Sequence, residues 1–163
     1  MVVKDLMKMI KVISGGQTGA DIGGLLLAES RGLETGGWMP YGWVTYDGSK
    51  PQYEERFGMK EHPSEGYVAR THANIRDSDG TVRFASDFSS PGEKCTLAGI
   101  KKFNKPHFDV HRDKAPDPEE MADWLRDNNI KVLNVAGNRE STSPGMAKFV
   151  QSYLAEVFDL QQG

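Results

Sequence analysis

A glycine-rich turn near the start of the chain has the composition of an anion-binding turn. Ser14-Gly15-Gly16-Gln17-Thr18-Gly19 separates a predicted strand, residues 9–13, from a predicted helix, residues 18–30. Backbone N–H groups at a helix N-terminus have no partner within the helix and attract phosphates. The glycine spacing matches neither the Walker pattern nor the dinucleotide pattern. On spacing alone, a phosphate site and a tight turn capped by Thr18 are equally supported.

A second turn of small and polar residues follows the last predicted strand. Asn134-Val135-Ala136-Gly137-Asn138-Arg139-Glu140-Ser141 connects a buried strand, residues 130–135, to an amphipathic helix, residues 145–158. Arg139 offers a bidentate contact to phosphate, and Ser141 offers a hydroxyl donor. If the two strands are neighbours, both helix N-termini face one crevice. The alternative is an exposed ion pair between Arg139 and Glu140.

A third group of polar residues lies in and after the predicted helix 67–77. Arg70, Thr71 and Asn74 share one helix face, which points either at the crevice or at solvent. Asp79 follows in the turn before the next strand. Together with Asp21 it offers a carboxylate for a ribose hydroxyl or a metal, but a turn former and a first-turn helix carboxylate are the more ordinary interpretations.

Aromatic residues gather in a glycine-rich loop. Trp38, Tyr41, Trp43 and Tyr46 have flat side chains that could stack on a pterin or a purine, or could simply belong to the core. No Ser-His-Asp or Cys-His order indicates a catalytic residue, and the histidine spacing indicates no metal site.

Strands and helices alternate along the chain. Further strands are predicted over residues 35–39, 81–85 and 106–110, and further helices over 93–103 and 116–128. This alternation predicts an α/β fold, a parallel sheet with helices on both faces and a ligand at the carboxyl ends of the strands. Residues 1–163 form one predicted domain with a loop insertion at about 41–66, in which 47–65 is too rich in glycine and proline for regular structure.

The composition is that of a globular protein. Of the 163 residues, 37% are hydrophobic and 26% are charged, and the formal net charge is -3. No basic stripe indicates a nucleic-acid partner, and one cysteine, Cys95, excludes an internal disulfide. Charged residues interrupt the apolar residues of 1–13, and no segment has the length of a membrane span, so we expect no signal peptide, no membrane partner and a cytoplasmic location.

Five motifs in order give the chain a resemblance to a known family. Beside the two turns above, these are Gly36-Gly37-Trp38-Met39-Pro40, Arg70-Thr71 with Asn74, and Asp77-Ser78-Asp79-Gly80-Thr81. The chain resembles the putative molybdenum cofactor carrier family, which is related to a Rossmann-like superfamily that includes the Lonely Guy phosphoribohydrolases and the DNA-processing A proteins. The resemblance implies a Rossmann-like sheet that holds the phosphate of a molybdopterin or a nucleotide between residues 15–18 and 137–141. It also implies a homo-oligomer.

The chain departs from the family pattern at three places. Ile22 stands where an arginine is common, and Asn138 stands where proline is common. No carboxylate follows Thr96 at the position that the phosphoribohydrolases use, which favours binding without turnover. The alternatives are a nucleotide N-glycosidase that uses Asp79 or Glu140 as acid or base, and a sensor or sponge for a nucleotide signal such as an ADP-ribose derivative.

Overall fold

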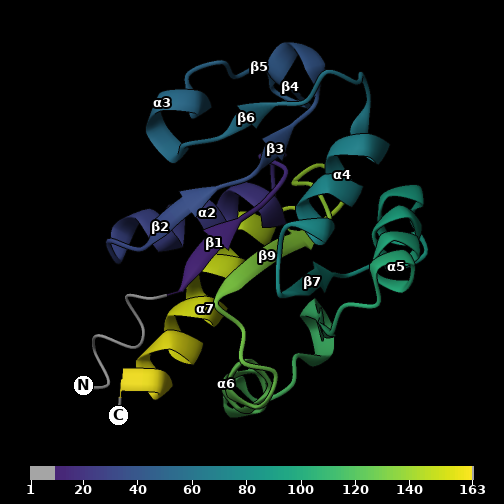
Figure 1. Ribbon diagram of the computed structural model, residues 1–163. Coiled ribbons are helices and arrows are strands. Elements are labelled where there is room, and N and C mark those ends of the chain that lie inside the picture. The colour runs from purple at the N-terminus through teal and green to yellow at the C-terminus, as the bar shows by residue number, and fades with distance from the viewer. Residues whose placement is uncertain (1–9, 163) are drawn as a thin grey trace.

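Five parallel strands form the central sheet of the protein. The computed structural model describes residues 10–162, so the predicted strand residue Met9 lies outside the described residues. The strand order is β2-β1-β9-β7-β8, and all neighbours are parallel (Figure 1). The bounds are β1 Lys11–Ile13, β2 Glu34–Gly36, β7 Gly80–Ala85, β8 His107–His111 and β9 Val132–Gly137.

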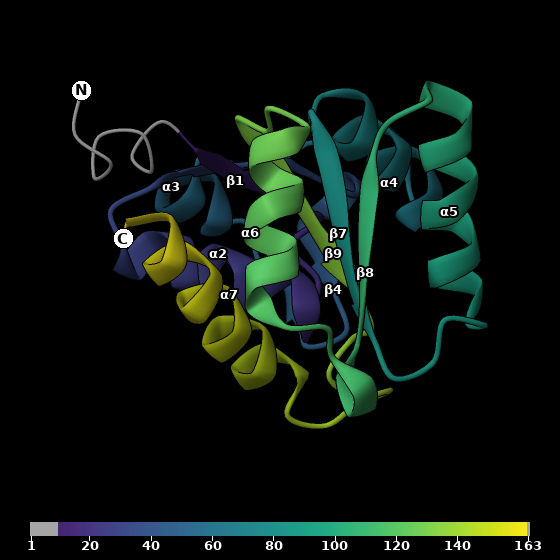
Figure 2. The same ribbon diagram turned by 90° about the horizontal axis from the view of Figure 1, so that it is seen from below.

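Helices cover both faces of the sheet, which confirms the predicted Rossmann-like α/β fold. One face carries α2, α6 and α7, and the other carries α4 and α5 (Figure 2). No helix within residues 10–162 is long and apolar enough to cross a membrane. The bounds are α2 Ala20–Ser30, α4 Tyr67–Arg76, α5 Pro91–Phe103, α6 Pro118–Asp127 and α7 Met146–Gln162.

The strand order is that of a Rossmann sheet in which the order of the strands along the chain is circularly permuted. Counting the strands from β9, then β1, β2, β7 and β8, the sheet reads 3-2-1-4-5, which is the start of the order of dinucleotide-binding folds. The chain therefore reverses its winding direction between β9 and β7. In open α/β sheets this switch point is where the connections diverge and leave a crevice at the carboxyl ends of the strands.

The segment between β2 and α4 forms a small unit above the sheet, at the top of Figure 1. The prediction that residues 47–65 lack regular structure is wrong, because a short helix and two short strands lie there. Five buried apolar residues account for this order, and one of them, Phe57, lies in the short helix. Leu25, Met39, Trp43, Phe57 and Met59 form this second apolar cluster. The elements are β3 Trp38–Met39, η1 Tyr41–Trp43, β4 Val44–Thr45, β5 Gly48–Ser49, α3 Tyr53–Phe57 and β6 Lys60–Glu61.

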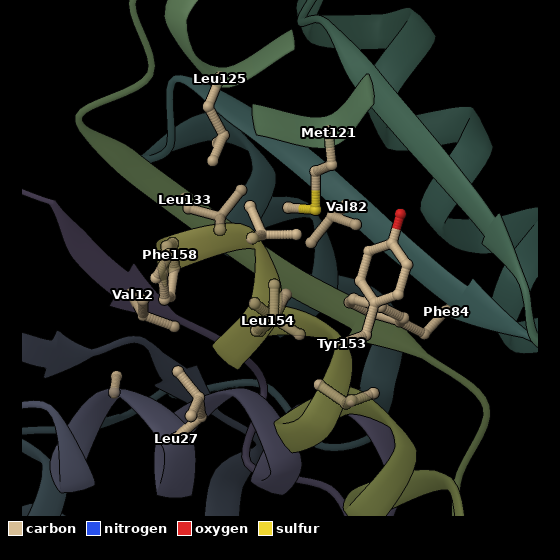
Figure 3. Packing of buried hydrophobic residues seen from close by; sticks show 14 of the residues in the cluster. Val12, Leu27, Val82, Phe84, Met121, Leu125, Leu133, Tyr153, Leu154 and Phe158 are labelled. Atoms are coloured by element: carbon tan, nitrogen blue, oxygen red, sulfur yellow. The ribbon is translucent and has the colours of Figure 1, made fainter. Parts of the chain in front are cut away.

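The main core lies between the sheet and the layer of α2, α6 and α7. Val12, Val82 and Leu133 point from three adjacent strands towards Leu154 and Phe158 of α7 (Figure 3). All five side chains are fully buried. Because α7 packs on both α2 and α6, the three helices of this layer share one core.

We expect Phe158→Ala to lower the free energy of unfolding by about 3–5 kcal/mol, because it leaves a cavity in this core. Leu160→Ala, on the same helix at 48% exposure, should cost less than about 1 kcal/mol. Urea denaturation of the two variants measures the difference. Equal losses would show that α7 does not pack against the sheet as described.

Candidate functional site

A cavity of about 270 Å³ opens at the switch point of the sheet. Its walls are the turn after β1, one side of α4, the first turns of α5, and the end of β9 with the turn that follows. β1 and β9 are paired neighbours, and residues of both turns line this one cavity. The start of α7, at Ala147, lines a different hollow, so the two helix N-termini do not both face the cavity as expected. The lining residues are Gly15, Gln17, Asp21, Tyr67, Arg70, Thr71, Asn74, Ser90, Pro91, Gly92, Glu93, Thr96, Asn134, Val135, Ala136, Gly137, Asn138, Arg139 and Thr142.

Arg70 lies against the first turn and lines the cavity. A Cβ atom on Gly15 would collide with the Arg70 guanidinium, so glycine there makes room for the arginine. Arg70 Nη1 donates to Thr71 Oγ1 at 2.7 Å and lies 3.9 Å from Asp21 Oδ2. Arg70 Nε is buried and donates to no described residue. One strong donor of the guanidinium is thus left without a partner among the described residues.

The N–H groups of the first turn are largely occupied within the protein. Gly16 N donates to Ser14 Oγ at 3.2 Å, and Gln17 N donates to Asp21 Oδ2 at 3.2 Å. Thr18 N donates to Gln17 Oε1 at 2.9 Å. The Asp21 carboxylate therefore takes the place at the N-terminus of α2 that was expected to receive a phosphate. The turn shapes the cavity and positions Arg70, while few of its amides remain free.

The Asp21 carboxyl is a desolvated component of this turn. Burial raises its pKa from 3.8 to about 6, against the opposing effects of the Arg70 charge and of the amides of Gln17 and Gly15. Desolvation outweighs the partners because Arg70 is not in direct hydrogen-bond contact with the carboxylate.

Glu93, in the first turn of α5, brings a second buried carboxyl to the cavity. Its side chain is 3% exposed, and Oε1 accepts no hydrogen bond from any described residue. Oε2 receives only a 3.5 Å contact from Asn138 Nδ2. Desolvation raises the pKa of Glu93 to about 7, and the Asp21 charge adds to the effect.

The charge of Arg83 opposes this rise in the pKa of Glu93, but Arg83 donates no hydrogen bond to the Glu93 carboxylate. The fork of Arg83 is held by Asp109, with Nε···Oδ1 at 2.8 Å and Nη2···Oδ2 at 2.6 Å. The remaining nitrogen, Nη1, donates to the main-chain oxygen of Glu93 at 3.3 Å, not to its carboxylate. The expectation that this helix lacks a cavity carboxylate is thus corrected, because the carboxylate precedes Thr96 instead of following it.

The second turn is tightly packed where it meets β7. Gly137 has φ +151°, and its Cα faces the Phe84 carbonyl so closely that a Cβ has no room. The Asn138 side chain accepts from the N–H groups of Ser86 and Asp87 at 2.9 and 3.1 Å. Arg139 is exposed beside the cavity, with its guanidinium carbon 5.2 Å from the centre of the Tyr46 ring.

The structure gathers half of the predicted site residues around the cavity: Gly15, Gln17, Arg70, Asn74, Gly137 and Arg139 line it. Asn74 also holds the insertion, because its Oδ1 accepts from Trp38 N at 2.8 Å.

The other predicted site residues lie elsewhere. Gly16, Thr18 and Glu140 line a hollow on the far side of the first turn. Glu140 accepts from the N–H groups of Gly145 and Ala147 at the start of α7, so it forms a helix cap instead of the ion pair with Arg139. Ser14 is buried beneath the turn, and the exposed Ser141 lines neither hollow.

Asp79 lies at the amino ends of β7 and β9, whereas the cavity lies at the carboxyl ends of the strands. It precedes β7, and its carboxylate accepts from the N–H groups of Lys131 and Val132 at 2.9 and 2.8 Å. Asp79 therefore fixes the start of β9, and we leave it out of the site.

The aromatic loop does not line the cavity either. Trp43 is buried in the second cluster, Trp38 Nε1 donates to Asp77 at 2.8 Å, and Tyr41 and Tyr46 are exposed. The aromatic side chain that lines the cavity is Tyr67 at the start of α4. Within residues 10–162, no three His, Cys, Asp or Glu side chains are placed to hold a metal ion.

The family that matches this chain is described as circularly permutated, in agreement with the permuted strand order of the sheet. Residues 12–158 match the model of the circularly permutated YpsA SLOG family. The chain belongs to this family. It is also similar to a solved structure from Syntrophus aciditrophicus SB named "Putative molybdenum carrier protein", with 34% identity over 91% of this chain and 93% of that one, and a TM-score of 0.82. No curated protein matches the chain.

We expect the free energy of unfolding of the Asp21→Asn variant, relative to the native protein, to increase as the pH rises. In the folded protein the pKa of Asp21 is about 6 instead of 3.8, so its protonated form stabilises the fold below pH 4 and this contribution is lost between pH 4 and 6. Asparagine cannot ionise. The free energy of unfolding of the variant relative to the native protein should rise by up to about 3 kcal/mol between pH 4 and 7.

Urea denaturation at a series of pH values measures this difference. Asp127→Asn, an exposed control at the end of α6, should show no such trend. A flat difference for Asp21→Asn would mean that Asp21 is not desolvated in the folded protein.

Proposed function

We propose that the cavity binds a phosphorylated heterocycle, a molybdopterin or a nucleotide-like molecule, and that the protein carries this ligand without converting it. The observation that carries the proposal is Arg70, which lines the cavity and whose buried Nε has no partner among the described residues. An unpaired buried donor is costly, and an anionic oxygen is the acceptor that best offsets that cost.

Arginines on two walls support binding of a phosphate. Arg70 comes from α4 and Arg139 from the turn after β9. Both guanidinium groups suit the bidentate geometry of phosphate oxygens. This arrangement differs from a turn of free amides, because Asp21 and Gln17 already occupy much of the first turn.

The remaining lining fits a flat ring. Tyr67 is 43% exposed and lines the cavity, so its ring has a free face. Val135 and Ala136 add apolar contact from the end of β9. A cavity with apolar walls and a few polar groups is the usual environment of a heterocyclic ligand.

The proposal includes molybdenum because the similar solved structure is named a putative molybdenum carrier protein. Arg70 and Arg139 fit the phosphate of a molybdopterin, and Tyr67 fits its pterin ring. Any metal would arrive with the ligand, because the described residues offer no cluster of metal ligands.

Carriage fits the site better than nucleotide hydrolysis by the residues that the sequence suggested. Asp79 lies at the amino ends of β7 and β9, and Glu140 caps α7. We also propose a cytoplasmic homo-oligomer, which the exposed side chains of Tyr41 and Val44 and the 62% exposed Tyr46 support as apolar surface for a second copy.

We expect Arg70→Met to weaken binding of the phosphorylated ligand by about 10- to 100-fold, which is the usual loss for a charge-assisted hydrogen bond. Native mass spectrometry of the gently purified protein identifies any retained ligand. Thermal shifts with molybdopterin, molybdate, AMP and ADP-ribose then rank the candidates, because a ligand that binds only the folded state raises the melting temperature.

Arg126→Met, an exposed change on α6, is the matched control, and Arg70→Lys should be intermediate because it keeps the charge and loses the planar fork. Unchanged binding by Arg70→Met would contradict the proposal. Chromatography of the incubated nucleotides reports any free base, which would indicate an N-glycosidase. A response to ADP-ribose alone would indicate a nucleotide sensor.

A further inference from the structure

We propose that Glu93 selects the heterocycle, and that it does so by accepting two adjacent N–H donors from the ring edge. Such an edge, a ring N–H beside an exocyclic amino group, is shared by pterins and guanine. This inference rests on the proposed function, since it names the chemistry of the ring that the same cavity takes.

The Glu93 carboxylate has hydrogen-bond acceptor capacity that no described residue uses. A carboxylate has two oxygens that each seek donors, and burial without donors costs free energy. Here Oε1 has no partner among the described residues, and Oε2 has one contact at the limit of hydrogen bonding, 3.5 Å from Asn138 Nδ2. Glu93 is also 3% exposed, so bulk water does not supply the donors.

The donors of Arg83 and Asn138, beside Glu93, are engaged with other residues. Arg83 gives its fork to Asp109 across the β7–β8 pair. The Asn138 amide is fixed on both sides, because its oxygen accepts from Ser86 N and its nitrogen donates to the Asp87 carbonyl at 3.1 Å. Glu93 lines the cavity, and neither Arg83 nor Asn138 supplies the donors that its carboxylate lacks, because both are engaged with other residues.

The geometry of the Glu93 carboxylate determines which ring edge it can bind. A carboxylate presents two parallel acceptors, so it matches an edge with two adjacent donors. Guanine and pterin offer such an edge, the ring N–H and the 2-amino group. Adenine offers a donor beside a ring nitrogen acceptor, and lumazine offers a donor between carbonyl oxygens. A carboxylate repels both of these acceptors.

Two walls of the cavity carry groups of opposite charge. Arg70 of α4 supplies a cation and Glu93 of α5 supplies an anion, and these two helices pack against each other beside the cavity. A ligand with an anionic phosphate and a donor-bearing ring edge meets both groups. Simple anions such as molybdate meet Arg70 and leave Glu93 unsatisfied.

Two matched ligand pairs test the inference on the native protein. GMP should bind about 10- to 100-fold tighter than AMP, and pterin should bind tighter than lumazine by a similar factor, as isothermal titration calorimetry would measure. Glu93→Gln should lower the affinity for GMP and pterin by about 10- to 100-fold and change that for AMP by less than about threefold. Glu156→Gln, the same change at an exposed position on α7, should alter none of these affinities.

The outcomes separate this inference from the proposed function. Equal affinities for GMP and AMP and for pterin and lumazine would overturn the selection by Glu93 and leave the phosphate site standing. A preference that survives in Glu93→Gln would also overturn it. No binding of any of these ligands, with no ligand retained in native mass spectrometry, would overturn the proposed function itself. The comparison of ligands on the native protein decides the matter even if the variant does not fold.

Discussion

The pairing of β9 with both β1 and β7 is the constraint on which the site depends. It places the carboxyl end of β9 between the carboxyl ends of β1 and β7. The turn after β9 then binds directly to the turn after β1, because Ala20 N donates to the Asn138 carbonyl at 3.1 Å and Glu140 N donates to Thr18 Oγ1 at 3.3 Å. Without that pairing, neither turn would face the first turns of α5.

Charge in the cavity is arranged at a cost to stability. Asp21 and Glu93 are both buried, and burial raises the pKa of each towards neutrality. Each has a nearby arginine that the fold directs mainly elsewhere: Arg70 touches Thr71 at the shortest distance, and Arg83 pairs with Asp109. Polar groups that lack full partners in the free protein are a common feature of sites that await a ligand. The pattern is consistent with a site whose polar groups are completed on binding.

Much of the fold was predictable from the sequence, because hydrophobic runs, turns and helix starts are local signals. The meeting of the two glycine-rich turns followed once the strands were placed as neighbours. Asp79 was misplaced although a signal existed, since a turn that precedes a strand lies at its amino end. Glu93 was missed because a carboxylate in the first turn of a helix is ordinary. Its lack of partners depends on Asp109 holding Arg83, which no local pattern encodes.

The permuted strand order also bears on how such a fold can be built. α7 ends, and β1 begins, at the edge of the sheet away from the cavity (Figure 1). A linker across that edge would join β9, α7 and β1 into one continuous βαβ unit, and new ends could then be opened in the connection between α6 and β9. The cavity would keep every wall, because none of these walls is formed by the peptide bonds that are made or broken. The ends of the polypeptide can therefore be moved along this fold without a change in the walls of the cavity.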